Sequence, residues 1–132
     1  MLRLTTALIG ALAPPLAIAW LWFGTWSPMP DVIVTATLHV VFLGLPALVL
    51  HFVIAPLRWW TLIGLGALCA TLPTAVWSWP LMVPPAPTVE EWAGYGEAVG
   101  VMAGYGAIAG LGFWLVWAFW NRIDALLEAR VQ

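Results

Sequence analysis

The chain contains no lysine, only four arginines and a single cysteine among its 132 residues. Charged residues make up 8% of it, against roughly 25% in ordinary soluble domains. Without a cluster of basic side chains there is no surface for nucleic acid, and we exclude that class of partner. The lone Cys69 excludes an internal disulfide, and two histidines without a cysteine cluster argue against a structural zinc site.

The usual sequence patterns of an active site are also missing. We find no nucleophile–base pair, no phosphate-binding loop and no paired carboxylates, so we expect a protein without enzymatic activity, metal or cofactor of its own. Apolar residues are abundant instead, at 64% of the chain, and the mean hydropathy is +0.99. A soluble core cannot absorb this much apolar surface, so we expect the surroundings to be a lipid bilayer.

Four apolar segments are long enough to cross a bilayer core of about 30 Å, at about residues 4–24, 32–55, 59–80 and 89–121. The first has a rival interpretation as a signal peptide, with Arg3, a short apolar region and a small-x-small site at 17–19. Because the apolar run continues through Trp22, we interpret it as a retained span. The sequence thus predicts an all-α integral membrane protein, a single domain over residues 1–132, folded as a four-transmembrane-helix bundle.

The fourth segment has a clear start and outlasts the membrane. Thr88 with Glu91 three residues later forms a capping box, which marks a helix N-terminus. A helix from there to about residue 129 would hold roughly 40 residues and measure about 60 Å. Its end has Ile123, Leu126 and Leu127 on one side. We therefore expect a C-terminal amphipathic helical extension that lies on lipid or contacts a partner.

Charge and tryptophan predict one orientation of the four spans. With the N-terminus in the cytoplasm, all four arginines fall on the cytoplasmic side, as the positive-inside rule expects, and Asp31, Glu90 and Glu91 fall outside. We therefore predict both termini inside, in a bacterial inner membrane. Tryptophans mark both membrane boundaries, the outer with Trp20, Trp22, Trp26, Trp77, Trp79 and Trp92, and the inner with Trp59, Trp60, Trp117 and Trp120.

Small residues at helical spacing predict where two spans pack. In the fourth span Gly96, Gly100 and Gly104 are four residues apart, and Gly106 and Gly110 repeat the spacing. In a membrane, glycines let a neighbouring helix backbone approach closely. The third span offers a stripe of small residues for this contact, Gly64, Ala67 and Thr71. We expect these two faces to pack together, and a ligand groove between them is the alternative.

Two ionisable residues lie inside the apolar zone, where such groups are candidates for function by default. Glu97 lies about 7 Å and His39 about 10 Å from the outer boundary, at 1.5 Å per helical residue. The two side chains could therefore meet and bind a cation or relay a proton. The alternative is a polar pair, or two groups that each reach water at the interface.

Histidines also raise the question of haem. His39 and His51 are twelve residues apart, which leaves their rings about 120° apart around a helix, so they cannot close around one haem. Ligation by His39 of a haem or chlorin completed by another subunit remains an alternative. The freed carbonyls below Pro46 and Pro73 are weaker candidates for an ion site.

These observations favour a non-enzymatic accessory, assembly or scaffold subunit of a larger membrane complex, or a homo-oligomer. The partners expected are the lipid bilayer and other membrane subunits or further copies of the chain. The first alternative is a small dimeric transporter or channel that uses Glu97 and His39 for ion or proton handling. The second is a pigment- or haem-binding subunit that uses His39.

Overall fold

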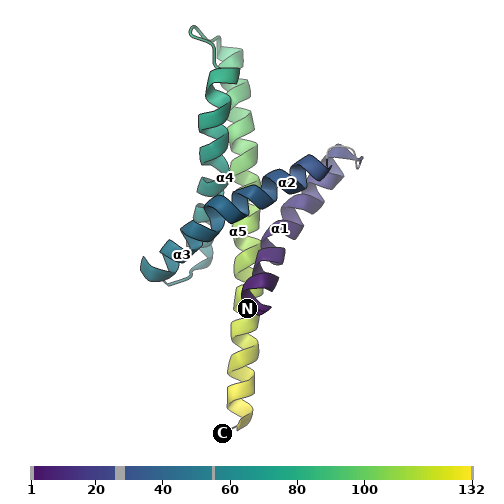
Figure 1. Ribbon diagram of the computed structural model, residues 1–132, viewed down its shortest axis with the longest axis vertical. Coiled ribbons are helices and arrows are strands. Elements are labelled where there is room, and N and C mark those ends of the chain that lie inside the picture. The colour runs from purple at the N-terminus through teal and green to yellow at the C-terminus, as the bar shows by residue number, and fades with distance from the viewer. Residues whose placement is uncertain (1, 26–28, 55, 132) are drawn as a thin grey trace.

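The computed structural model describes residues 2–25, 29–54 and 56–131, and within these ranges every regular element is a helix. The elements in chain order are α1 (Leu2–Phe23), α2 (Met29–His39), the short π-helix η1 (Val40–Gly44), α3 (Leu45–Ile54), α4 (Trp59–Met82) and α5 (Val89–Val131). Figure 1 shows their arrangement.

Four helical segments in the described ranges are long and apolar enough to cross a membrane, Leu2–Phe23, Met29–Ile54, Trp59–Trp77 and Val89–Ala129. The second of them joins α2, η1 and α3 into one continuous rod. These segments confirm the all-helical class expected from the sequence, with four helical segments whose length and composition suit a membrane span. Ala55, the expected end of the second span, and Trp26 lie outside the described residues.

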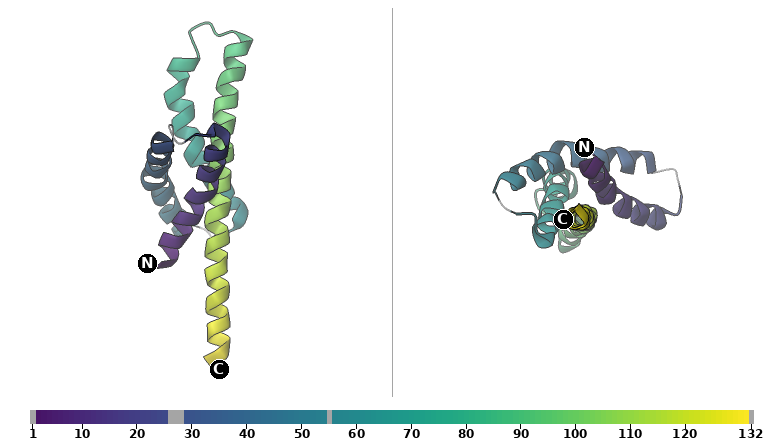
Figure 2. Two further views of the ribbon diagram at one scale, coloured as in Figure 1. Left: turned by 90° about the vertical axis from the view of Figure 1, so that its right-hand side faces the viewer. Right: turned by 90° about the horizontal axis from the view of Figure 1, so that it is seen from below.

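Helix α5 is the axis on which the other helices pack. Helix α4 runs antiparallel along its N-terminal half, and α1 packs against its C-terminal half (Figures 1 and 2). The rod α2–η1–α3 lies diagonally across these helices and touches them much less. The lower end of α5 extends past the N-terminus and has no helix beside it (Figure 2).

The start of α5 is fixed by the predicted capping box. The Thr88 backbone N–H donates to Glu91 Oε2 at 2.7 Å, and the Glu91 N–H donates to Thr88 Oγ1 at 3.3 Å. These bonds satisfy two backbone donors that a helix N-terminus otherwise leaves without partners. The helix then continues for 43 residues, about 64 Å, which confirms a helix longer than a bilayer core.

A π-helical turn interrupts the second span immediately before a proline. Pro46 has no N–H to donate, so the ordinary hydrogen-bond pattern cannot continue through it. The chain accommodates the missing donor with the wider π-helical turn Val40–Gly44, at the end of which the Leu45 N–H donates to the Val40 carbonyl. The structure places this irregular turn directly before Pro46 and next to His39.

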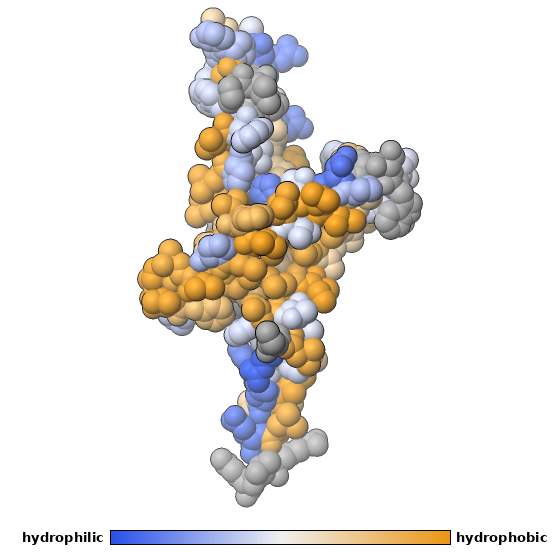
Figure 3. Space-filling view, viewed as in Figure 1, coloured by the Kyte–Doolittle hydropathy of each residue, from blue (hydrophilic) through white to orange (hydrophobic). Residues whose placement is uncertain are grey.

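The buried core is small. Its main cluster draws on α1, α3, α4 and α5 and consists of Ala7, Ala11, Leu48, Leu62 and Phe113. Most large apolar side chains are exposed, and Figure 3 shows an almost continuous apolar surface over α2, α3 and the adjacent helices. A bilayer or a partner protein therefore has to cover most of this chain's hydrophobic surface.

Candidate functional site

Helices α4 and α5 approach each other most closely at glycines. A Cβ atom added at Gly106 would lie 2.7 Å from both Ala70 Cβ and the Gly66 carbonyl carbon. One turn further along α5, a Cβ at Gly110 would lie 2.7 Å from the Leu62 carbonyl carbon. Real Cβ atoms essentially never come this close, so these positions have no room for any side chain. Gly106 and Gly110 thus pack closely against α4, as expected. The residues that they contact are Gly66 and Leu62, which do not belong to the predicted stripe.

A second contact of the same kind joins α1 to α5. A Cβ at Gly112 would lie 3.1 Å from the Gly10 carbonyl carbon, and one at Gly10 would lie 2.5 Å from Val116 Cγ2. The sequence analysis did not single out either glycine. One helix therefore uses glycine for close contact with two different neighbours.

The row Gly96, Gly100 and Gly104 does not take part in these contacts, which corrects our expectation. A Cβ added at any of the three, or at Gly64 on α4, meets no described atom within 4 Å. Ala67 and Thr71 of the predicted stripe are half-buried. The reason is rotational: at about 100° per residue, Gly104 lies about 160° around the helix from Gly106.

Glu97 lies on the same unoccupied side of α5. Nine residues before Gly106, it points about 180° away from the face that contacts α4, and it is exposed. We call Gly96, Glu97, Gly100 and Gly104 the open glycine face. Among the described residues, no hydrogen bond or ion pair joins Glu97 to His39. The hypothesis that these two residues together handle ions stays a prediction.

His39 has one ring nitrogen bonded and one unpaired. Its Nδ1 lies 2.8 Å from the Thr35 carbonyl oxygen. A carbonyl only accepts, so Nδ1 carries the hydrogen, and in the neutral ring Nε2 keeps its lone pair. Nε2 is buried and has no hydrogen-bond partner among the described residues. Metal-bound histidines use this arrangement, with the second nitrogen donating to a carbonyl, but here neighbouring atoms cover the free nitrogen.

His51 has a structural role. The Thr61 hydroxyl donates to the Arg58 carbonyl at 2.8 Å, so it accepts a hydrogen bond from His51 Nε2, 3.2 Å away. This bond ties the end of α3 to the start of α4. The His51 Nε2 atom is thereby already paired with Thr61.

Predicted anchor tryptophans make ring contacts at both ends of the α4–α5 pair. Near the loop that joins α4 to α5, the centroid of the Trp79 ring lies 5.0 Å from that of the Trp92 ring. There the Tyr95 hydroxyl also donates to the Ala75 carbonyl at 2.9 Å. At the other end Trp117 stacks on Phe113 at 5.9 Å. The remaining anchors are Trp20, Trp22, Trp59, Trp60 and Trp77, all exposed, and Trp120, which is half-buried.

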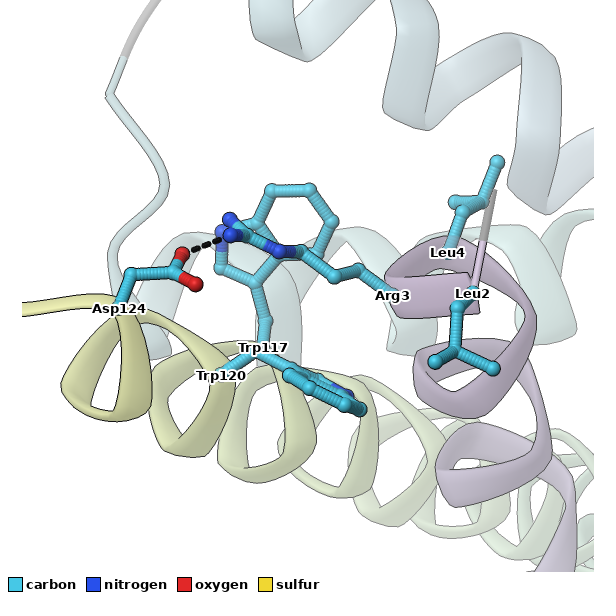
Figure 4. Close-up of a pocket in the computed structure, with 6 residues that line it drawn as sticks. All are labelled: Leu2, Arg3, Leu4, Trp117, Trp120 and Asp124. Atoms are coloured by element: carbon cyan, nitrogen blue, oxygen red, sulfur yellow. Dashed lines mark ion pairs between the residues drawn. The ribbon is translucent and has the colours of Figure 1, made fainter. Parts of the chain in front are cut away.

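The structure also assembles a site that the sequence analysis missed. Arg3 near the N-terminus forms an ion pair with Asp124 of α5 (Figure 4). Nearby, Trp120 Nε1 donates to Thr6 Oγ1 at 2.8 Å. These contacts bring together residues that are more than a hundred positions apart in the sequence, so no local sequence pattern predicts the site. They border an open recess of about 470 Å³, lined by Leu2, Arg3, Leu4, Trp117, Trp120 and Asp124.

No group of three or more metal-ligating side chains occurs in the part of the chain that the structure describes. Comparison with known proteins gives no match, whether with protein-family models, curated proteins or solved structures. The functional argument therefore depends on the surfaces and contacts of this chain alone.

Proposed function

We propose that this protein is a non-enzymatic subunit of a membrane assembly, where it acts as an accessory or scaffold component beside other membrane proteins or further copies of itself. The observation that supports this is the open glycine face of α5. On the other sides of the same helix, glycines are used for backbone contact with α4 and α1. On the open face, three glycines and the exposed Glu97 have no neighbouring helix among the residues that the structure describes.

Energetics favours a protein neighbour over lipid at this face. Glycines in the lipid-facing part of a helix leave a groove that flexible acyl chains fill poorly, whereas a second helix packs into it closely. An ionisable side chain in the apolar zone of a membrane helix usually faces protein or water rather than lipid. Both features indicate that a helix of another subunit covers the open glycine face.

We further propose that both termini lie in the cytoplasm and that the membrane is a bacterial inner membrane. The support is the positive-inside rule, since Arg3, Arg58, Arg122 and Arg130 all fall on one side. The pairing of Arg3 with Asp124 is consistent with this proposal, because it requires both helix ends to be on the same side.

The test is purification in mild detergent followed by measurement of the particle mass. We expect an assembly larger than one chain. Gly100→Leu should release the single chain without unfolding it, because a Cβ added at Gly100 meets no atom of another described helix within 4 Å. Val101→Leu is a milder change on the same side of the helix, between Glu97 and Gly104. It adds only one methylene and does not fill the space beside a glycine, so it should disturb the assembly much less than Gly100→Leu. Recovery of wild-type protein only as a monomer would refute the proposal.

A second candidate function is ligation of a haem or chlorin by His39, completed by another subunit. The observation that favours it is the hydrogen bond to Thr35, which leaves the Nε2 lone pair available. Because Nε2 is covered, neighbouring side chains would have to move to admit the iron or magnesium. Membranes containing the wild type should then show a haem or chlorin absorption band that His39→Ala abolishes and His51→Ala keeps. Identical spectra for the two variants would exclude this function.

A further inference from the structure

The recess between the two ends of the chain has walls held in place by their own contacts. Trp120 is fixed by its hydrogen bond to Thr6, and Trp117 by ring contacts with Phe113 at 5.9 Å and Phe52 at 5.5 Å. Figure 4 shows the Arg3 side chain extending from α1 across the recess toward Asp124 on α5. Since the walls are already ordered, a ligand that enters this site loses little binding energy to ordering them.

The ion pair in the recess is open to exchange. The Arg3 side chain is 44% exposed and that of Asp124 is 32% exposed. An ion pair this accessible contributes little net stability, because water competes for both groups. Arg3 has five N–H donors and the carboxylate has two oxygens, so both groups keep hydrogen-bonding capacity beyond the pair.

The position of the recess matches the level of lipid headgroups. Leu2, Leu4 and the two tryptophans supply an apolar rim, and the first two residues beyond Trp120, Asn121 and Arg122, are polar. Tryptophan and arginine concentrate where hydrocarbon gives way to headgroups. The recess therefore faces apolar chains on one side and water on the other.

We propose that this recess binds the headgroup of a zwitterionic phospholipid with a primary ammonium group, of the phosphatidylethanolamine class. The lipid phosphate would pair with the Arg3 guanidinium and its ammonium with the Asp124 carboxylate, with indole faces beside the cation. One half-exposed ion pair is thus replaced by two. The apolar rim takes the start of the acyl chains, which free phosphoethanolamine lacks.

The same charges discriminate against other headgroups. An anionic lipid of the phosphatidylglycerol class would satisfy Arg3 but has no cation for Asp124, and its own negative charge would be repelled by the carboxylate. A choline headgroup has a cation without N–H donors, so it cannot hydrogen-bond to Asp124. The ethanolamine headgroup complements both charged groups of the recess.

Native mass spectrometry of protein released from vesicles of equal parts phosphatidylethanolamine, phosphatidylcholine and phosphatidylglycerol tests this proposal. We expect the wild type to retain phosphatidylethanolamine over phosphatidylglycerol by about fivefold, the ratio that one exposed ion pair supplies. Asp124→Asn should abolish that preference and favour phosphatidylglycerol, while Arg3→Gln should lose both lipids. The matched controls are Arg122→Gln and Glu128→Gln, which remove similar charges outside the recess and should retain the wild-type preference.

A second measurement on the wild type alone keeps the proposal falsifiable if the variants fail to fold. Added phosphatidylethanolamine should raise the midpoint of thermal unfolding, while phosphatidylglycerol and soluble phosphoethanolamine should not. Equal stabilisation by soluble phosphoethanolamine would overturn the assignment to a lipid. Equal retention of all three lipids by the wild type, or an unchanged preference in Asp124→Asn, would show that the ion pair only tethers α1 to α5.

Discussion

The glycine contact between α4 and α5 gives a quantitative prediction, because the same helix contains a matched control. Gly106→Ala adds one methyl group 2.7 Å from Ala70 Cβ, where ordinary contact begins at 3.4 Å. The two helices must therefore separate by at least about 0.7 Å at this point. A gap of about 0.5–1 Å already removes a quarter to a half of the dispersion energy of each contact across it.

The net cost follows from two opposed effects. Overpacking of this kind destabilises by about 1–3 kcal/mol, and alanine gains up to about 1 kcal/mol over glycine in helix propensity. With the full propensity gain, we expect Gly106→Ala to lower the free energy of unfolding by about 0–2 kcal/mol. Gly100→Ala has the same propensity gain with no neighbour to displace, so it should be neutral or stabilising by up to about 1 kcal/mol.

The assay is unfolding of the isolated chain in mixed micelles with increasing sodium dodecyl sulfate. Tryptophan fluorescence reports separation of α4 from α5, because Trp79 and Trp92 are in contact across the pair. If Gly106→Ala were as stable as Gly100→Ala or more so, the close contact would be elsewhere, and the assignment of the open glycine face would be wrong too.

Three further experiments test two hydrogen bonds between helices and the proposed topology. Tyr95→Phe removes the hydrogen bond to α4 and should cost about 0.5–1.5 kcal/mol in the same titration, whereas Tyr105→Phe should cost less, since that hydroxyl has no described partner. Trp120→Phe removes an indole N–H donor between α5 and α1 and should cost about 1–2 kcal/mol. In a cysteine-free background, a cysteine at Ala86 should react with a membrane-impermeant reagent from outside intact cells and one at Ala129 should not, and the reverse labelling would overturn the proposed topology.

Local features of this fold were predictable from the sequence. The Thr88–Glu91 capping box, the length of α5 and the four apolar spans depend on neighbouring residues and on composition, and all appear in the structure. The disturbance at Pro46 was predictable for the same reason, although the sequence did not show that a π-helical turn would accommodate it.

The choice among glycines was not predictable, because α5 contains two rows with the same spacing. The antiparallel register places Gly106 beside Gly66 and Tyr95 beside Ala75. By that register Gly100 lies level with Thr71, so the predicted pairing had the right height. However, the predicted row of glycines lies on the side of α5 that does not contact α4. Which side makes the contact is set by the direction from which α4 approaches α5, and residue spacing contains no information on that direction.

Individual residues of the candidate sites could be found from the sequence, but their contacts with other helices could not. Glu97 and His39 were found from their depth in apolar segments, but depth leaves open whether two side chains face each other. The pair Arg3 and Asp124 joins the first helix to the last. No periodicity within either helix marks that contact, since it depends on where α1 crosses α5.

The central place of α5 has a consequence for how the chain is made. Helix α1 packs on α5 through Gly10 and Gly112, which the ribosome synthesises about 100 residues apart. At about 5–20 residues per second, α1 waits roughly 5–20 s in the membrane before its partner exists. Helix α4 also lacks its neighbour until α5 follows it. The first three spans are therefore made before the helix against which two of them mainly pack, and most of the tertiary contacts form only after most of the chain has been translated.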